Sequence, residues 1–448
     1  MTSVAGGPVA VELGPDEAAA RVAASPPWLA ARRRAAWDAY TALPMPSSQR
    51  DEDWRRTDIS GLHLERFTPL RDVDAGLLAA MRLQRDQAAP GAAFALDAPA
   101  ADLVITDADG LLAQGVIVTT LQDAASRHTE LVQRALAAHT VDESKFSALW
   151  NAMWRGGVFV YVPSGVDAVA PVWIAHAASG DGAAVFPATV IVLDDAASLT
   201  VIDAYASPRG SQPLFSDAIA ALTAGRDSRL DYIALQQWGE GAWHVATHRA
   251  SLGANAKLRF FGATFGARLQ KAYWEASLDG TGAEADIAGV CFGDGEQHLD
   301  HQSLQAHRAP ETRSNLLLKV AVRDQARSVY SGLIEVAPAA VHADGYVQNR
   351  NLLLSHGAKA DSVPRLEIRA NDVKCGHGAT AGHIDDEQRF YFMTRGVPRE
   401  DADSLIVRGF MDDVIARVPH VGVANLLGTL LDSEIAGEPQ SGVTEVEG

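Results

Sequence analysis

The segment Asp195-Ala196-Ala197-Ser198-Leu199 joins a turn of small and polar residues to the start of an apolar run. Similar junctions recur down the chain and end at the following anchor residues: Leu230, Leu258, Ala285, Ser328 and Ala360. From Leu199 onward, successive anchors lie 31, 28, 27, 43 and 32 residues apart. Periods of this length are typical of solenoids, in which coils stack because no single coil buries its own apolar face.

The residues between these junctions favour strands. Apolar residues alternate or run together in Val158-Phe159-Val160-Tyr161-Val162 and in Thr189-Val190-Ile191-Val192-Leu193, and long helical patterns nearly vanish between residues 156 and 384. A repeat that strands fill predicts a β-solenoid, or β-helix, and hence a mainly β fold. A β-sandwich with hairpin turns is the alternative that this pattern leaves open.

Helical patterns flank the β region on both sides. Residues 16–24 and 28–43 are rich in alanine and carry apolar residues at helical spacing. After residue 385 an acidic helix start precedes a second helix over 399–417, so we expect two helices there. The second helix should present one apolar face, made of these residues: Ala402, Leu405, Ile406, Phe410 and Val414.

These changes in pattern divide the chain into four parts. We predict a mostly helical N-terminal domain over 1–155, a β-helix core over 156–384 and a helical C-terminal domain over 385–436. The last stretch, 437–448, is acidic and rich in Gly, Ser and Glu, which predicts a flexible tail.

The composition limits the classes of partner. The 448 residues include 38 Lys and Arg against 56 Asp and Glu, which gives a formal net charge of −18. A surface that binds nucleic acid needs clustered cations, so we expect no nucleic-acid partner. We also expect no membrane association, because no apolar run approaches the roughly 20 residues of a membrane helix. With only two cysteines and no basic signal-peptide pattern, the chain is expected to be cytoplasmic.

The first candidate site lies in the segment Val373-Lys374-Cys375-Gly376-His377-Gly378-Ala379-Thr380. Cys375 and His377 are two residues apart, so their side chains point the same way if the backbone is extended. A thiolate and an imidazole suit zinc, copper(I) or iron, and glycines allow close approach of a metal or a partner. Because a stable site needs about four donors, the others would come from elsewhere in this chain or from another chain. The alternative is a buried cysteine beside a capping histidine in a turn.

A second candidate site is the group His298, Asp300, His301 and His307. In a strand, His298 and Asp300 share one face, whereas His301 points to the other. An iron or zinc site with two histidines and one carboxylate needs three converging ligands, which this spacing lacks without help from Glu296 or His307. A self-contained metalloenzyme that uses this group is therefore the alternative function, and hydrogen-bonded histidines on a sheet are the simpler interpretation.

Motifs for common catalytic mechanisms are missing. The sequence contains no GxxxxGK[ST] loop, no strand-GxGxxG-helix unit, no GxSxG elbow and no HExxH. His244 and His248 stand alone in an alternating stretch and are interpreted as structural. None of the common catalytic plans is complete, so we assign no catalytic residues.

Four stretches near the C-terminus carry a family resemblance: Asn349–Ser355, Pro364–Ile368, Asp372–Thr380 and Phe390–Gly396. They resemble the SufB/SufD family of iron–sulfur cluster assembly proteins. The SufD side of the family is the more similar, because the SufB side usually has the string HEAT where this chain has His377-Gly378-Ala379-Thr380. Weaker agreement extends upstream to about residue 50.

The resemblance implies a right-handed parallel β-helix core flanked by helical N-terminal and C-terminal domains. It also implies a non-catalytic scaffold of the SUF system, which pairs with a SufB-type subunit and binds a SufC-type ATPase. In such a complex a nascent, transient iron–sulfur cluster forms at the SufB–SufD interface. The position of His377 lies at that interface in the family, with Cys375 as a weaker candidate. No tightly bound cofactor is expected in the isolated chain.

The family places the ATPase near the C-terminal helices. An amphipathic helix pair after the β region suits docking into a groove of such a partner. The candidate partner-binding residues are Phe390, Tyr391, Arg395, Gly396, Leu405, Ile406 and Phe410. A third alternative is a homodimeric β-helix adaptor without metal chemistry, in which Cys375 and His377 only pack, because the exposed solenoid edges of the isolated chain invite pairing.

Overall fold

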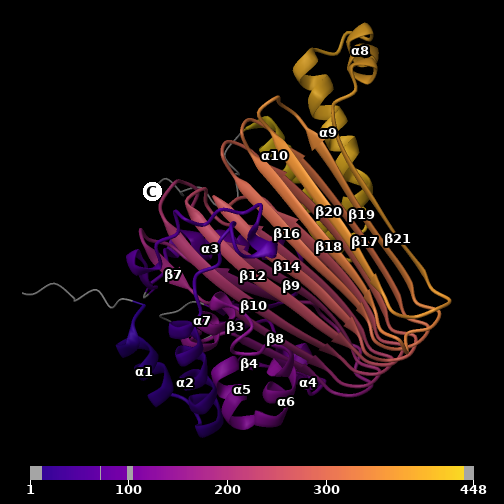
Figure 1. Ribbon diagram of the computed structural model, residues 1–448. Helices are drawn as coiled ribbons and strands as arrows, with labels where there is room; N and C mark the ends of the chain where they lie inside the picture. The colour runs from indigo at the N-terminus through magenta and orange to yellow at the C-terminus, as the bar shows by residue number, and fades with distance from the viewer. Residues whose placement is uncertain (1–12, 71, 98–103, 438–448) are drawn as a thin grey trace, which may run out of the picture.

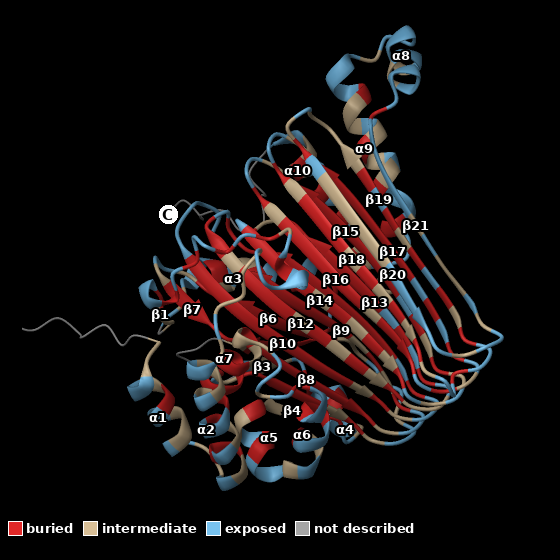
Figure 2. Ribbon diagram, viewed as in Figure 1, coloured by how far each residue is buried: buried red, intermediate tan, exposed pale blue. Residues whose placement is uncertain are grey.

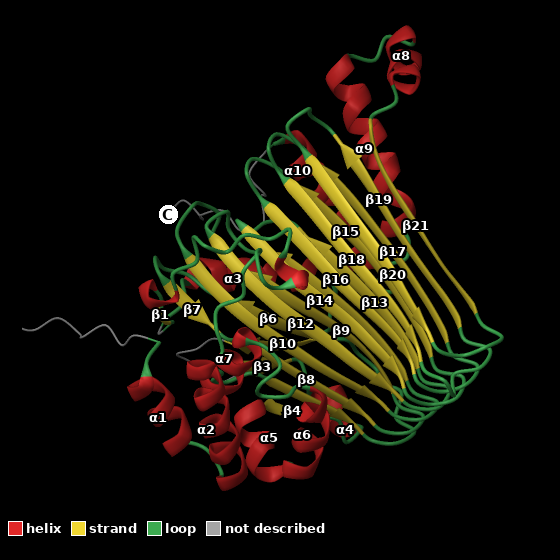
Figure 3. Cartoon of the chain, viewed as in Figure 1, coloured by secondary structure: helices red, strands yellow, loops and turns green. Residues whose placement is uncertain are grey.

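The computed structural model describes residues 13–70, 72–97 and 104–437. Two large sheets face one another along most of the molecule, with helices at both ends of the strand stack (Figure 1 and Figure 3). The predicted flexible tail over 437–448 lies, apart from Gly437, outside the described residues.

The chain alternates between the two sheets, so that each coil contributes one strand to each. The main strands of the first sheet are β5 (Val158–Val162), β8 (Ala188–Leu193), β10 (Leu214–Ala224), β12 (Ala242–Leu252), β14 (Leu269–Leu278), β16 (His298–His307), β18 (Arg327–Val336) and β20 (Lys359–Ile368). The main strands of the second sheet are β6 (Val172–Ala177), β9 (Ser198–Ala206), β11 (Arg229–Gln237), β13 (Lys257–Thr264), β15 (Glu284–Gly293), β17 (Arg313–Val322), β19 (Asp344–Leu353) and β21 (Lys374–His383). Neighbouring strands within these two sets are parallel, which makes the core a parallel β-helix.

The strand register explains the period read from the sequence. Leu199, Leu230, Leu258 and Ala285 are successive partners in the second sheet. The next partner in that sheet is Ser314, whereas the sequence pattern led to Ser328, which pairs with Ala360 in the first sheet. The irregular step of 43 residues is therefore a crossing from one sheet to the other.

Each coil turns a corner before its second-sheet strand through a left-handed residue. The stacked positions are Ala196, Asp227, Asn255, Gly282, Glu311, His342 and Asp372, each with φ between 55° and 74°. Asn and Asp tolerate this region better than most side chains do. The turns also bond to one another, since the amide of Asp227 donates to the carbonyl of Ala254 and that of Asn255 to Thr281. Polar and small residues at the junctions thus follow from the corner geometry.

The space between the sheets, which we call the lumen, is the main core. Leu199, Leu230 and Leu258 project into it from the second sheet and Leu299 from the first. Figure 2 shows the strands as almost entirely buried except in the last coils. The parallel β-helix is thereby confirmed, and the sandwich alternative is wrong because successive strands pair in parallel rather than as hairpins.

The N-terminal region supplies both helices and strands. Its helices are α1 (Pro15–Ala23), α2 (Pro27–Ala42), α3 (Ala75–Ala88), α4 (Asp109–Ala113), α5 (Leu121–Arg127), α6 (Thr129–Ala135) and α7 (Lys145–Met153), with 3-10 turns η1 (Glu52–Trp54), η2 (Leu64–Arg66) and η3 (Leu136–Ala138). Its short strands β1 (Thr68–Pro69), β2 (Ala93–Asp97), β3 (Val104–Thr106) and β4 (Ile117–Thr120), with β7 (Ala183–Val185) from the first coil, extend the two sheets. The N-terminal end of the β-helix is thus covered.

Three helices follow the β-helix, where the sequence pattern predicted two: α8 (Asp386–Thr394), α9 (Arg399–Ile415) and α10 (Val421–Ala436). The pattern missed α10 because its sequence is apolar on most sides, which weakens the helical period. Together with α3, α9 and α10 cover the outer face of the second sheet.

The apolar face predicted for α9 is partly wrong. Ala402 and Val414 are buried and Ile406 and Phe410 are half-buried, but Leu405 is 51% exposed. The buried face continues instead through Val407, Met411 and Ile415. The reason is that α9 meets the sheet through its later residues, where Phe410 and Asp413 contact Lys319 of β17, whereas Asp403 near its start pairs with Arg389 of α8. In the ranges that the structure describes, no helix has the length and apolarity needed to cross a bilayer.

Candidate functional site

Cys375 and His377 lie on β21, the last strand of the β-helix. β21 pairs with β19 on one side, and within the described residues no strand pairs with its other edge. The same holds for β20 in the first sheet, which pairs only with β18. The C-terminal end of the β-helix is therefore uncovered, and we call it the open end.

Both side chains of the pair face the lumen. Cys375 is the register partner of Gly345 and His377 that of Val347, and both partners are buried. Residues in register share a face, so the lumen side of β21 carries Cys375 and His377. Cys375 is half-buried against the lumen core, whereas His377 is exposed because no further coil covers it. The expectation that the two side chains point the same way is met.

The two glycines face the opposite side. Gly376 and Gly378 lie at the outward positions of β21, where the side chain of Tyr346 runs across them. A Cβ atom on Gly376 would lie 3.4 Å from ring atoms of Tyr346, and one on Gly378 would lie 3.2 Å from its hydroxyl. These glycines therefore make room for a neighbouring ring on the outer face, on the side away from the thiol and imidazole.

The electrostatic setting keeps Cys375 protonated in the isolated chain. Burial raises the pKa of its thiol; a backbone hydrogen bond from Gly345 opposes this in part, and the Asp344 carboxylate makes the smallest contribution, which again raises the pKa. The thiolate is the form that binds a metal. Metal binding at this position would therefore have to release a proton.

The pair is not a complete metal site by itself. Across residues 13–70, 72–97 and 104–437, no three His, Cys, Asp or Glu side chains are grouped so as to hold a metal ion. Cys375 and His377 offer two donors at an uncovered end, which is fewer than the four of a closed tetrahedral site. Any further donors would have to come from outside the described residues.

The rim around the pair is apolar. Leu366 and Ile368 are the register partners of the buried residues Ile334 and Val336, so they sit on the lumen side of β20. With no coil beyond them they remain 38% and 41% exposed. Figure 2 shows the loss of burial along these last strands. Large exposed aliphatic side chains at the end of a core are typical of an interaction surface.

The second candidate group does not converge. His298 and Asp300 face outward, where both contact Thr57 of the N-terminal region and Asp300 also accepts from Lys271 Nζ at 2.6 Å. His301 faces the lumen, with Nε2 3.1 Å from the hydroxyl of Thr264. His298 and Asp300 thus share Thr57 as a partner on the outer face, whereas His301 has its partner in the lumen.

His307 completes this picture. Its two ring nitrogens lie 2.7 Å from the hydroxyl of Thr312 and 2.8 Å from that of Ser314. Burial lowers the pKa of His298, His301 and His307 to about 4 each, so all three are neutral. These contacts match the simpler interpretation of hydrogen-bonded histidines, and they do not form the metal site that a self-contained metalloenzyme would need.

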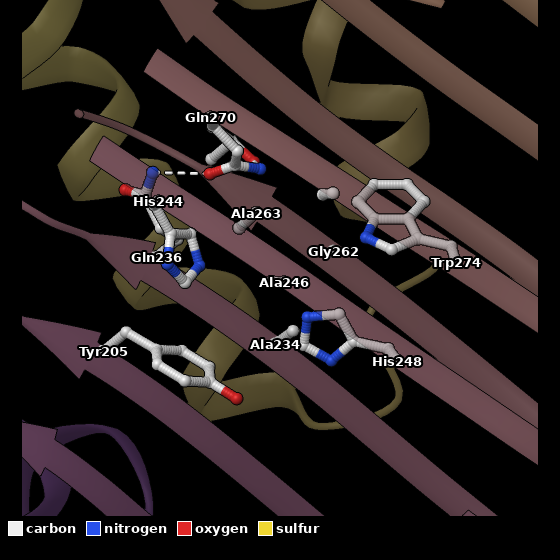
Figure 4. A pocket seen from close by; sticks show the side chains of 12 residues that line it. Tyr205, Ala234, Gln236, His244, Ala246, His248, Gly262, Ala263, Gln270 and Trp274 are labelled. Carbon is white, nitrogen blue, oxygen red and sulfur yellow. Dashed lines mark hydrogen bonds between the residues drawn. The ribbon is translucent and has the colours of Figure 1, made fainter. Parts of the chain in front are cut away.

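His244 and His248 line a small cavity in the lumen, shown in Figure 4 beside Tyr205, Gln236 and Gln270. His244 Nδ1 lies 3.0 Å from the hydroxyl of Ser216, and His248 Nδ1 lies 3.1 Å from that of Tyr232. Burial lowers the pKa of His244 to about 3 and that of His248 to about 4. The cavity measures about 10 Å³, the space of one water molecule. Both histidines thus act as neutral hydrogen-bonding groups in the core.

The helices α8 and α9 form a hairpin that projects beyond the sheets (Figure 1). Of the predicted partner-binding residues, Phe390 and Tyr391 are 67% and 57% exposed. Arg395 stacks over the Tyr391 ring at 4.7 Å and donates to its hydroxyl at 2.8 Å. Gly396 and Leu405 are also exposed, but Ile406 and Phe410 pack against the helices and sheet.

Comparison with protein families identifies the chain. Residues 175–410 match the family model described as SUF system FeS cluster assembly, SufBD core domain. Residues 101–174 match the SufBD protein N-terminal region. The chain belongs to the SufB/SufD family. The resemblance inferred from the four C-terminal stretches is thereby confirmed.

Individual relatives of this SufB/SufD family member agree. The chain is 27% identical over 417 residues to the iron–sulfur cluster assembly protein SufD of Bacillus subtilis. The aligned residues cover 92% of this chain and 94% of that protein. It is 30% identical over 336 residues to a SufBD family protein of Mycobacterium leprae, with 72% and 84% covered. A Staphylococcus saprophyticus SufBD family protein is 25% identical over 307 residues, with 68% and 66% covered.

Sequence reasoning about this family member missed three residues of the open end: Tyr346, Leu366 and Ile368. The alternation of Leu366 and Ile368 with Arg365 and Glu367 did offer a signal for the apolar rim. Tyr346 gave none, because its contact with the glycines spans a register of 30 residues.

Proposed function

We propose that this SufB/SufD family member is a scaffold subunit of the SUF iron–sulfur cluster assembly complex. In this proposal it pairs with a SufB-type subunit through the open end and binds a SufC-type ATPase through the α8–α9 hairpin. A nascent cluster then forms between the two scaffold subunits. The observation that carries the proposal is the uncovered last coil, whose lumen side presents Cys375 and His377.

The open end supports pairing with a subunit of similar fold. β20 and β21 leave one row of backbone groups each without a strand partner among the described residues. Such edges are templates for further pairing, and proteins usually block or cover them. Leu366 and Ile368 add apolar area at the same place. A partner that continues both sheets would cover the edges and the apolar rim together.

The donor set supports a shared cluster rather than a resident one. Cys375 and His377 supply a thiolate and an imidazole, which suit iron in a cluster. Two donors bind a cluster only weakly, so the partner would contribute the remaining ligands. The completed cluster could then dissociate from the complex. The isolated chain accordingly holds no tightly bound cofactor, and it contributes ligands rather than catalysis.

The hairpin supports an ATPase contact. Phe390 and Tyr391 are exposed on α8, none of whose residues is buried, and Arg389 of this helix pairs with Asp403 of α9 at 2.6 Å. An exposed aromatic face on a short helix suits a groove in a partner. Because α8 lies at the end of α9 that points away from the sheet, movement of a bound ATPase would be transmitted through α9 to the scaffold.

Two further elements belong to the proposal. When no SufB-type partner is present, a second copy of the chain covers the open end and forms a homodimer. The protein acts in the cytoplasm, in keeping with its two free cysteines and the reducing conditions that cluster assembly needs.

The test is co-expression of this chain with its SufB-type and SufC-type partners, followed by capture through this chain and anaerobic iron and sulfide analysis. We expect His377→Ala to leave the complex assembled while iron and sulfide per complex fall several-fold. His383→Ala is the matched control, because His383 is an exposed histidine on the lumen side at the other end of β21. Wild-type cluster content in His377→Ala would contradict the role of His377, and failure to capture the SufB-type partner would contradict the scaffold role.

A further inference from the structure

The strand that carries the proposed ligands is weakly supported by its own sequence. β21 has three glycines among its outward residues, Gly376, Gly378 and Gly382. Glycine in a strand gives no side chain to pack and costs more backbone entropy than other residues do. β21 also lacks a strand on its second edge within the described residues. A strand of this composition at an edge would be expected to fray.

One side chain compensates on the outer face. Tyr346 is the register partner of Gly376, and its ring atoms Cδ2 and Cε2 lie 3.4 Å from where a Cβ of that glycine would be. Its hydroxyl lies 3.2 Å from the corresponding point on Gly378. The ring therefore extends along β21 from one glycine to the next and passes behind His377. An aromatic ring laid over a glycine in the neighbouring strand is a known way to support edge strands.

We propose that Tyr346 is a positioning residue for Cys375 and His377, because its ring clamps β21 through Gly376 and Gly378. This inference rests on the proposed function, in which the pair must meet a partner's ligands. A clamp on the outer face fixes which side chains point to the lumen, since rotation or slippage of the strand would turn them away. Ligands that are held in place before the partner arrives lose less freedom on binding.

The clamp makes a specific prediction about the phenol. In wild type the Tyr346 hydroxyl is the atom that stands in the way of a side chain at position 378. Gly378→Ala should therefore displace the hydroxyl end of the ring by a few tenths of an ångström and weaken its contact with the strand. Adding Tyr346→Phe removes the obstructing oxygen, so the double variant should regain the contact that Gly378→Ala alone weakens.

The first measurement uses the isolated full-length chain and needs no partner. Amide hydrogen exchange over 374–380 and the alkylation rate of Cys375 report how well β21 is held. We expect Tyr346→Ala to raise both by roughly three-fold or more and Gly378→Ala to raise both by a smaller factor, with no change in β17. Tyr346→Phe and the Gly378→Ala/Tyr346→Phe double variant should stay near wild type. Gln348→Ala is the matched control, because Gln348 lies on the same strand and face but contributes no ring.

Unchanged exchange and alkylation in Tyr346→Ala would overturn the clamp. So would a rise in Tyr346→Phe as large as that in Tyr346→Ala, because the ring would then play no part. A rise that spreads equally to β17 would also overturn it, since that would be general destabilisation.

The second measurement uses the co-expressed complex with its SufB-type and SufC-type partners. We expect Tyr346→Ala to assemble normally but to carry less iron and sulfide per complex, and Tyr346→Phe to restore both. Full cluster content in Tyr346→Ala would overturn the positioning role. If wild type carries no cluster at all, the proposed function fails, whereas the clamp is judged by the exchange data alone.

Discussion

The imidazole of His176 lies between two carboxylates, 3.0 Å from Oδ2 of Asp97 and 3.0 Å from Oδ1 of Asp203. Burial by itself would lower the pKa of this histidine, but the carboxylates of Asp203 and Asp97 outweigh it and raise the pKa to about 9. His244 and His248, equally buried in the same lumen, have no such pair and are neutral. The charge on a lumen histidine is thus set by its nearest carboxylates.

This contrast predicts a pH-dependent stability. The pKa of His176 is raised above its unfolded value of about 6.5, so its contribution is complete below that pH and is lost as pH rises through about 9. We expect the free energy of unfolding to fall between these pH values, by on the order of 3 kcal/mol from this group. Denaturant unfolding as a function of pH measures it.

The control for that prediction is His176→Gln, which keeps a hydrogen-bonding side chain without the titrating charge. The variant should be less stable near pH 6, because Asp203 would be left buried with only hydroxyl partners nearby. It should also lack the decline between pH 6.5 and 9. The same decline in the variant and in wild type would refute the assignment.

At this scale, sequence reasoning identifies only what is local. Cys375 and His377 are two apart, so their common direction follows from strand alternation. The ring of Tyr346 contacts the same strand because Tyr346 pairs with Gly376, which is 30 residues later in the chain, and the local sequence gives no sign of this contact. Likewise, the separate partners of His298 and His301 depend on Thr57 and Thr264, which lie far away in the chain.

Among the elements, α3 and α10 join the two flanking regions on the outer face of the second sheet. Their backbones approach so closely at Gly422 that a Cβ there would lie 1.9 Å from the carbonyl oxygen of Ala88. Gly422→Ala should therefore destabilise the protein by about 1–3 kcal/mol, because backbone must move. The matched control is Gly409→Ala in α9, where nothing lies within 4 Å and alanine should stabilise the helix by about 0.5–1 kcal/mol.

Denaturant midpoints of the two glycine variants decide this prediction. Equal midpoints for Gly422→Ala and wild type would mean that α3 and α10 do not pack at this distance.

Substitutions in the α8–α9 hairpin can distinguish residues that bind the ATPase from residues that stabilise the fold. Phe390→Ser with Tyr391→Ser should abolish capture of a SufC-type ATPase while changing the free energy of unfolding by no more than about 0.5 kcal/mol, since both side chains are exposed. Met411→Ala, in the buried part of α9, should instead cost about 2–4 kcal/mol. Retained ATPase capture by the double serine variant would remove the hairpin from the proposed interface.

Elements could likewise be predicted where the local sequence pattern determines them, and not where distant parts of the chain do. The β-helix could be recognised because every coil repeats the same corner, with a left-handed residue before a strand. α10 was missed because its surroundings, α3, α9 and the sheet, bury most of its circumference and remove the polar face that marks a surface helix. The exposed Leu405 was misassigned because α9 extends past the sheet that would have covered it.

On the scale of the whole molecule, the two ends of the β-helix differ. At the N-terminal end β2, β3 and β4 extend the sheets and helices pack over them; β3 pairs antiparallel with β2, and β4 pairs antiparallel with β5. At the C-terminal end α9 and α10 lie against the outer face of the second sheet instead, and α8 projects beyond it. A solenoid normally carries a cap at each end. Within the described residues no cap covers the open end, and this is why we propose that another subunit binds there.

The apolar rim of that end yields the last prediction. Leu366→Lys with Ile368→Lys adds two positive charges on the lumen side of β20, where a partner would have to bury them without counter-ions. Both self-association of the isolated chain and capture of a SufB-type subunit should fall roughly ten-fold or more, whereas folding should persist because the side chains are already partly exposed. Glu367→Lys changes the net charge by the same amount on the outward side of the same strand, so it serves as the control. Sedimentation velocity and co-purification measure the two associations. If the Leu366→Lys/Ile368→Lys variant and the Glu367→Lys control lose association to the same extent, the net charge of the chain, and not the lumen side of the open end, governs assembly.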